Sequence, residues 1–253
     1  MNPEELLDLF HARSGIVCAI GAGGKKTILY HLLHSHPGRT AFAATVFTRV
    51  FPDTLQVTPV IAEELQLLKQ LSLHGDDVRV GLATPSEKSG RYGGLSPALI
   101  SRIHRERGLD ATFVKADGAR TRLIKAPKSD EPVLPDDCAT VICVLSARAI
   151  GQPLSERIAH RVEHISRVAE LNSGDNVEPV HLARLFCREQ GLLQGTGQRT
   201  VVPVINMVDD PQREGLAREA AESALTMSQR FDRVLLTQMQ DPSKPVVAVV
   251  ERT

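Results

Sequence analysis

Glycines and lysines stand together at one point near the amino terminus of this chain. The run is Gly21, Ala22, Gly23, Gly24, Lys25, Lys26 and Thr27. Glycine adopts positive φ angles readily and lets bare backbone N–H groups approach an anion. A lysine at the same point adds a full positive charge that can reach a terminal phosphate. The run is therefore typical of a phosphate-binding loop (P-loop), and we expect its residues to bind ATP or GTP.

The run departs from the regular G-x-x-x-x-G-K-[ST] pattern in either register. With Lys25 as the motif lysine, Gly24 fits, but Ala19 replaces the first glycine. In that register Lys26 also replaces the hydroxyl residue that binds Mg²⁺. With Lys26 as the motif lysine, Thr27 fits, but Lys25 stands where a glycine belongs. The alternative interpretation is a glycine-rich turn between a strand and a helix, with no ligand.

Two other polar groups follow apolar runs that are typical of strands. Asp117 comes after the run 111–116, where P-loop proteins place a carboxylate that organises Mg²⁺ or water. Asp117 is thus the candidate catalytic residue and metal ligand, and an ordinary Asp-Gly turn is the alternative. Asn206 and Asp209 resemble the N-K-x-D element that recognises guanine in GTPases, with Met207 in place of its lysine. A helix cap is the alternative for this pair.

The elements that must position these groups alternate along the chain. Short apolar runs indicate buried strands, and amphipathic segments indicate helices, one of them at about 62–73 with Leu65, Leu68 and Leu71 facing inward. This order predicts an α/β fold with a doubly wound, mostly parallel sheet of about seven strands. Because the carboxyl ends of parallel strands share one edge, the three candidate groups should meet there. We expect one P-loop-like domain over 1–253, with a helical cap inserted at about 153–190.

Composition excludes several classes of function. An apolar fraction of 42% is ample for a core, and 30 basic residues balance 30 acidic ones, so charge gives no argument for nucleic acid or acidic membranes. No apolar run is long enough to span a bilayer, and the acidic start of the chain is unlike a signal peptide, so we expect a cytoplasmic protein. Lys125 and Lys128 are expected to be available to anions. His160, Glu163 and His164 match H-x-x-E-H, and zinc binding is the alternative to a solvated helix face there.

The chain resembles the YqeC family, accessory proteins of selenium-dependent molybdenum hydroxylases. The resemblance lies in the segments GAGGK (21–25), TRVFP (48–52), ADGA (116–119), LIKAP (123–127), EPVLP (131–135), AIGQPL (149–154) and HR (160–161), with Asn206 and Asp209. It assigns Lys25 to the family lysine. It also implies that the segment at 160–164 is a family motif and not a metalloprotease helix.

Four positions depart from the family pattern. Lys26 stands where the family usually has Thr, Arg49 where it has His, Lys115 where it has Glu, and Met207 where it has Lys. The losses of a hydroxyl, a carboxylate and a lysine that packs on the base weaken the case for Mg²⁺-dependent hydrolysis more than the case for anion binding.

The resemblance implies a nucleotide-binding accessory protein that assists maturation of a selenium- or molybdenum-containing cofactor or hydroxylase. A weak NTPase is one form of this function, with Asp117 acting on Mg²⁺ or water and Asn206 with Asp209 facing the base. The alternatives are a non-hydrolytic carrier of a nucleotide-containing cofactor, such as a molybdopterin dinucleotide, and a degenerate P-loop scaffold that binds a partner protein. The expected partners are a nucleotide and a molybdenum hydroxylase.

Overall fold

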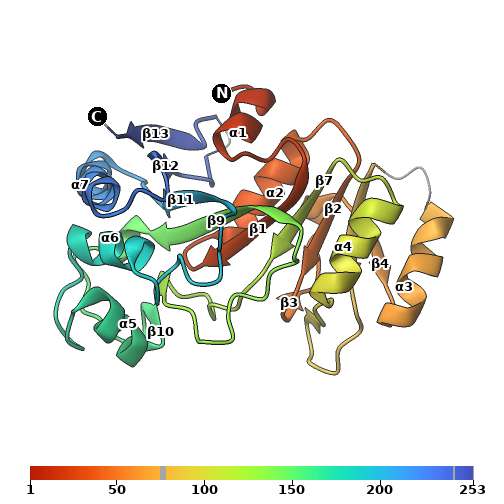
Figure 1. Cartoon of the computed structure of the whole chain (residues 1–253), viewed down its shortest axis with the longest axis horizontal. Coiled ribbons are helices and arrows are strands. Elements are labelled where there is room, and N and C mark those ends of the chain that lie inside the picture. The colour runs from red at the N-terminus through yellow and green to blue at the C-terminus, as the bar shows by residue number, and fades with distance from the viewer. Residues whose placement is uncertain (75–77, 242, 253) are drawn as a thin grey trace.

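A parallel sheet organises the computed structural model, which describes residues 1–74, 78–241 and 243–252 (Figure 1). Its strands in this part of the chain are β1 (Gly15–Gly21), β2 (Thr40–Ala44), β4 (Thr58–Ile61), β5 (Arg79–Ala83), β7 (Ala111–Lys115), β9 (Cys138–Ser146), β11 (Thr200–Asn206), β12 (Arg233–Thr237) and β13 (Val246–Glu251). They lie in the order β13-β12-β11-β9-β1-β7-β2-β5-β4. Neighbouring strands are parallel except β12 and β13, which are antiparallel. The predicted α/β class and mostly parallel sheet are confirmed.

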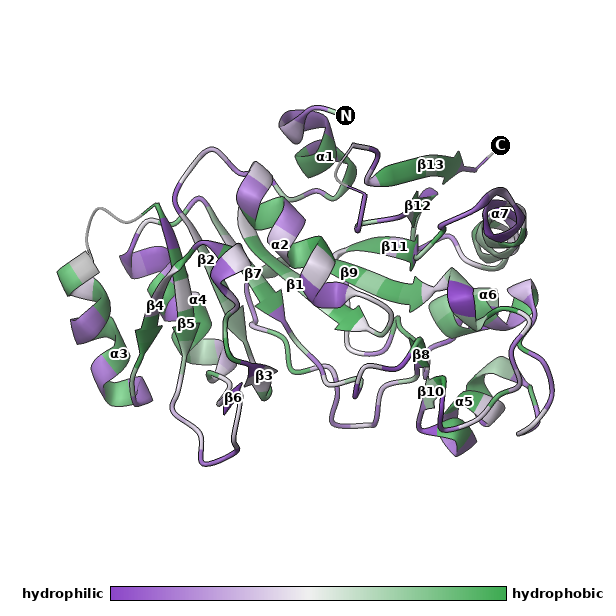
Figure 2. Ribbon diagram, turned by 180° about the vertical axis from the view of Figure 1, so that it is seen from behind, coloured by the Kyte–Doolittle hydropathy of each residue, from purple (hydrophilic) through white to green (hydrophobic). Residues whose placement is uncertain are grey.

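Seven α-helices in the described residues cover both faces of this sheet. They are α1 (Pro3–Leu9), α2 (Lys25–Ser35), α3 (Glu64–Leu71), α4 (Pro97–Glu106), α5 (Val162–Ala169), α6 (Pro179–Cys187) and α7 (Pro211–Met227). The apolar residues of α1 and α2 pack on one face, and those of the other five helices pack on the opposite face. Figure 1 shows α4 in front of the sheet, and the reverse view in Figure 2 shows α2 in front.

The central strand β1 lies at the point in the sheet where the order of the strands changes direction. It pairs with β7 on one side and β9 on the other, and the strands that follow it in sequence extend away in both directions. Its residues from Ile16 to Gly21 are all buried, as expected for a strand covered on both faces. In open α/β sheets, ligands bind at the carboxyl ends of the strands at such a point. The loop that follows β1 therefore occupies the expected position for a site.

Two small sheets lie beyond that edge of the main sheet. β3 (Thr48–Arg49) pairs with β6 (Arg91–Tyr92), and β8 (Ile124–Lys125) pairs with β10 (Ala159–His160). Figure 2 shows both pairs on the side of the sheet opposite to the chain termini. The segment 153–190, which was expected to form a helical cap, contains β10, α5 and α6, and α6 packs beside α7.

Two details of the predicted fold are wrong. The main sheet has nine strands in the described residues, and not about seven; β4 was missed because it is short, lies at the sheet edge and contains Pro59. The helix predicted at 62–73 is α3, which buries Leu67 and Leu71 and leaves Leu65 99% exposed. Leu71 is buried and Leu68 packs against the core as predicted, so only Leu65 was assigned to the wrong side of the helix.

Candidate functional site

The loop between β1 and α2 provides no side-chain cap for the start of α2. Its first half is fixed by the chain, because the N–H of Ala22 donates to the carbonyl of Val144 at 2.8 Å and that of Gly23 to Arg122 at 3.1 Å. Gly24 is the N-cap of α2, with a φ of 124° and no side-chain cap, and the first turn of α2 contains no acidic residue. The unpaired N–H groups of such a turn, together with the helix dipole, attract an anion.

Asn206 holds this loop from the end of β11. Its amide nitrogen donates to the carbonyl of Gly23 at 2.8 Å, and its oxygen accepts from the hydroxyl of Thr237 at 2.8 Å. A Cβ on Gly24 would collide with the same amide, so only glycine fits there. Asn206 is buried, and both ends of its amide are engaged within the chain. In the structure Asn206 therefore positions the loop through Gly23, and recognition of a base by Asn206 stays a prediction.

Asp209, the other residue of the predicted base-recognition element, lies nearer to solvent than Asn206. Asp209 is exposed, and its carboxylate pairs with Arg148 at 2.6 Å. Met207 between the two has a φ of 62°, and its sulfur accepts from the hydroxyl of Ser146 at 3.1 Å. This left-handed residue turns the chain sharply after β11, which separates Asp209 from the buried Asn206.

Asp117 faces the loop from the end of β7 and is 1% exposed. Its Oδ2 accepts from the N–H of Gly21 at 2.8 Å and pairs with the ammonium of Lys125 at 2.8 Å. The ammonium of Lys25 lies 2.9 Å from Oδ1, without an aligned hydrogen bond, and also donates to the carbonyl of Gly21. Burial acts to raise the pKa of Asp117, but the two lysines outweigh it and hold the pKa below its usual value.

The ion pairs continue away from the loop. Lys125 also pairs with Glu131 at 2.7 Å, and Arg161 binds the two oxygens of Glu131 at 2.7 and 2.9 Å. We call the series Lys25, Asp117, Lys125, Glu131 and Arg161 the charge ladder. Although burial works in the opposite direction, Arg161 and Lys125 lower the pKa of Glu131 to about 2. The expectation that Lys125 is available to anions is wrong, because it is fully buried between two carboxylates.

The carboxylate expected to organise Mg²⁺ does not fit that ion in this arrangement. Both oxygens of Asp117 face ammonium groups, and Lys26 stands where the motif hydroxyl would bind the metal. Among the residues that the structure describes, no group of three or more His, Cys, Asp or Glu side chains is placed to hold a metal ion. This arrangement gives no support to the predicted roles of Asp117 as a metal ligand and as a catalytic residue, and both stay predictions.

Lys26 and Thr27 are half-buried in the first turn of α2. The ammonium of Lys26 lies 5.9 Å from the centre of the Tyr30 ring. Burial lowers its pKa, and Arg49 and Arg91 lower it further. Neither arginine was predicted as a site residue, and the only signal was the presence of Arg49 where the family has histidine. The loop, Asp117 and Asn206 meet at one sheet edge, and this predicted convergence is confirmed.

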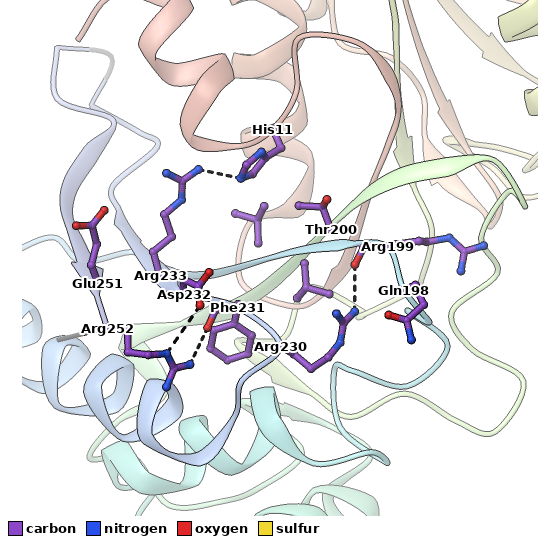
Figure 3. A pocket seen from close by; sticks show the side chains of 12 residues that line it. His11, Gln198, Arg199, Thr200, Arg230, Phe231, Asp232, Arg233, Glu251 and Arg252 are labelled. Carbon is purple, nitrogen blue, oxygen red and sulfur yellow. Dashed lines mark hydrogen bonds and ion pairs between the residues drawn. The ribbon is translucent and has the colours of Figure 1, made fainter.

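A cavity of about 790 Å³ lies near the starts of β11 and β12, at the edge of the sheet opposite to the loop (Figure 3). Arginines line it, and each of them forms side-chain hydrogen bonds within the chain, although the Nε atoms of Arg199 and Arg252 have no hydrogen-bond partner. Arg233 contacts His11 at 2.9 Å, Arg230 donates to the carbonyl of Arg199 at 3.0 Å, and Arg252 donates to that of Phe231 at 2.9 Å. These contacts tie the amino end of the chain and the end of α7 to the sheet, so the cavity is a weaker candidate than the loop.

Comparisons with known proteins agree with the sequence motifs. Residues 17–163 match the family described as YqeC protein. An Escherichia coli K12 protein named "Uncharacterized protein YqeC" is 25% identical over 188 residues, which cover 74% of this chain and 73% of that protein. No solved structure matches the chain, so the P-loop NTPase type of the fold stays a prediction. Within the described residues, every helix is too short or too polar to cross a membrane.

Proposed function

The chain belongs to the YqeC family, and we propose that it is a nucleotide-binding accessory protein that assists maturation of a selenium- or molybdenum-dependent hydroxylase. The observation that supports nucleotide binding is the start of α2, which has no side-chain cap and no acidic residue in its first turn. Such a turn binds phosphate through backbone N–H groups and the helix dipole. The link to a hydroxylase rests on the family resemblance.

The surroundings of Asp117 favour binding over hydrolysis. A hydrolytic site needs a side chain that orients water toward the phosphate, and Asp117 is the predicted one here. Here the carboxylate is enclosed by Lys25, Lys125 and the N–H of Gly21, all within 2.9 Å. We therefore favour a non-hydrolytic carrier of a nucleotide or of a cofactor that contains one, such as a molybdopterin dinucleotide. A weak NTPase is the second candidate, and it requires that ligand binding separate Lys25 from Asp117.

Calorimetric titration with ATP, GTP and CTP, each with excess Mg²⁺ and with EDTA, tests the proposal. We expect at least one nucleotide to bind and no phosphate release above that of buffer. Gly24→Ala should abolish binding, because the added Cβ collides with Asn206 and distorts the loop. Gly215→Ala is the matched control, since that glycine lies within α7 and its Cβ would meet open space.

Each outcome separates the candidates. Binding without turnover supports the carrier, and turnover that depends on Mg²⁺ supports the NTPase. If the wild-type protein binds none of the three nucleotides, or if Gly24→Ala binds as well as Gly215→Ala, the loop is only a structural turn. The degenerate scaffold that binds a partner protein would then be the remaining interpretation.

A further inference from the structure

Three cationic side chains from other elements act electrostatically with Lys26 near the start of α2. Lys26 belongs to α2 itself, Lys115 ends β7, and Arg49 and Arg91 belong to β3 and β6. The antiparallel pairing of β3 and β6 places Arg49 directly opposite Arg91. Like charges directly opposite each other on paired strands are destabilising. We call these four residues the cation cluster.

The cation cluster forms no ion pair with an acidic side chain among the residues that the structure describes. In the part of the chain that the structure describes, neither arginine forms an ion pair, and the charges that act on Lys26 come from those two arginines. The ammonium of Lys115 donates to the carbonyl of Phe47 at 3.0 Å. The nearest carboxylate, Asp117, already pairs with Lys25 and Lys125. Among these residues only Asp117 acts against the repulsion, at Lys115, and it already pairs with two other lysines.

The protonation of Lys115 shows the same imbalance. Burial lowers its pKa to about 7, with Lys25, Lys26 and Lys125 also lowering it and Asp117 acting in the opposite direction. An anion placed among these side chains would relieve the repulsion and return the pKa toward its usual value.

We propose that Lys26, Lys115, Arg49 and Arg91 bind the outer phosphates of a polyphosphate ligand whose inner phosphate lies on the loop 21–27. This inference rests on the proposed function and names the class of ligand, a nucleoside di- or triphosphate or a dinucleotide pyrophosphate. The cluster neutralises the phosphate charge that Mg²⁺ neutralises in P-loop proteins. Arginine forms bidentate contacts with phosphate, and two of them opposite each other can bind one group from both sides.

Titration of the wild type and two double variants with inorganic tripolyphosphate, a nucleoside triphosphate and the matching monophosphate, in EDTA and again with excess Mg²⁺, tests this inference. Arg49→Gln with Arg91→Gln removes the two cluster arginines. Arg102→Gln with Arg218→Gln removes the same charge from exposed positions in α4 and α7. Because one charged hydrogen bond contributes at least about tenfold in affinity, the cluster variant should lose at least about tenfold for both polyphosphates. Its affinity for the monophosphate should change by less than about twofold.

Titration with tripolyphosphate distinguishes phosphate binding by the cation cluster from recognition of a whole nucleotide. If the wild-type protein binds tripolyphosphate but no nucleotide, the cluster stands and the proposed function fails. If it binds a nucleotide equally well in both double variants, or only with Mg²⁺, the inference is overturned and the proposed function stands. If it binds neither probe, both are overturned. Lys26→Thr, which restores the family residue, should make triphosphate binding depend on Mg²⁺, while the wild-type affinity stays within about twofold with and without the metal.

Discussion

Replacement of Lys125 by methionine tests whether the charge ladder stabilises the carboxyl edge of the sheet. The ammonium lies 2.8 Å from Asp117, 2.7 Å from Glu131 and 2.7 Å from the carbonyl of Gly118, with no exposure to solvent. Methionine has a similar length, so the change removes the charge and leaves little empty volume. Asp117 then retains Lys25, and Glu131 retains Arg161.

The size of the effect follows from these distances. At an effective dielectric constant of about 20, each of the two contacts is worth about 6 kcal/mol of attraction, which desolvation of the ammonium offsets in large part. Removal of one partner from a buried ion pair costs about 3–5 kcal/mol. For a chain of this size the expected fall in Tm is about 6–20 °C. Lys128→Met is the matched control, because that lysine is exposed and should change the unfolding free energy by less than about 0.5 kcal/mol.

Urea denaturation followed by circular dichroism, repeated from neutral to acidic pH, measures the difference in unfolding free energy between the wild type and each variant. Because the folded-state pKa values of Asp117 and Glu131 are lowered, their contribution to stability is present above the unfolded values and is lost as pH falls through the folded ones. For Glu131 that range lies between about 4.5 and about 2. The gap between wild type and Lys125→Met should therefore narrow on acidification. A gap below about 1 kcal/mol at neutral pH, or one that does not narrow, would refute the argument.

Three further predictions concern the loop and its surroundings. Asn206→Ala should destabilise the fold by about 1–3 kcal/mol and weaken nucleotide binding, because the carbonyl of Gly23 loses its partner; thermal unfolding and titration measure both, with exposed Asn172→Ala as the control. Polyphosphate binding should take up a proton near pH 7 and weaken as pH rises, because the anion favours the charged form of Lys115; titration in buffers of different ionisation enthalpy measures the uptake, which Lys115→Met should remove. Asp209→Asn should abolish a modest preference for GTP over ATP, and equal binding of both nucleotides by the wild type would contradict recognition of the base by this element.

Local patterns in the sequence were sufficient to predict the loop and its position. The buried run before Gly21, the glycines and the apolar spacing of α2 specify a strand, a turn and a helix within about 20 residues. Alternation of strands and helices then placed Asp117 and Asn206 at the same edge. Both predictions depend on neighbouring residues and on a general rule for parallel sheets.

Contacts that no helix or strand periodicity determines could not be predicted in the same way. Lys125 belongs to a polar, proline-containing segment that is typical of an exposed loop, and its burial depends on Glu131 and Asp117 approaching it from two sides. The opposition of Arg49 and Arg91 depends on pairing between two strands of two residues each, about 40 residues apart. Strands this short have no periodicity to detect. The residues that the sequence did not identify are therefore those whose roles depend on tertiary pairing.

The cations at this edge divide into two groups with different consequences. Lys25 and Lys125 are buried, and their charge is balanced by Asp117 and Glu131, so they fix the loop before a ligand arrives. The cation cluster is unbalanced, so its charge remains available to a ligand. A hydrolytic P-loop site also needs Mg²⁺ and a side chain that orients water toward the phosphate. Here the nearest carboxylate, Asp117, is already held by two lysines. The distribution of charge therefore argues for a site that holds polyphosphate firmly and does not cleave it.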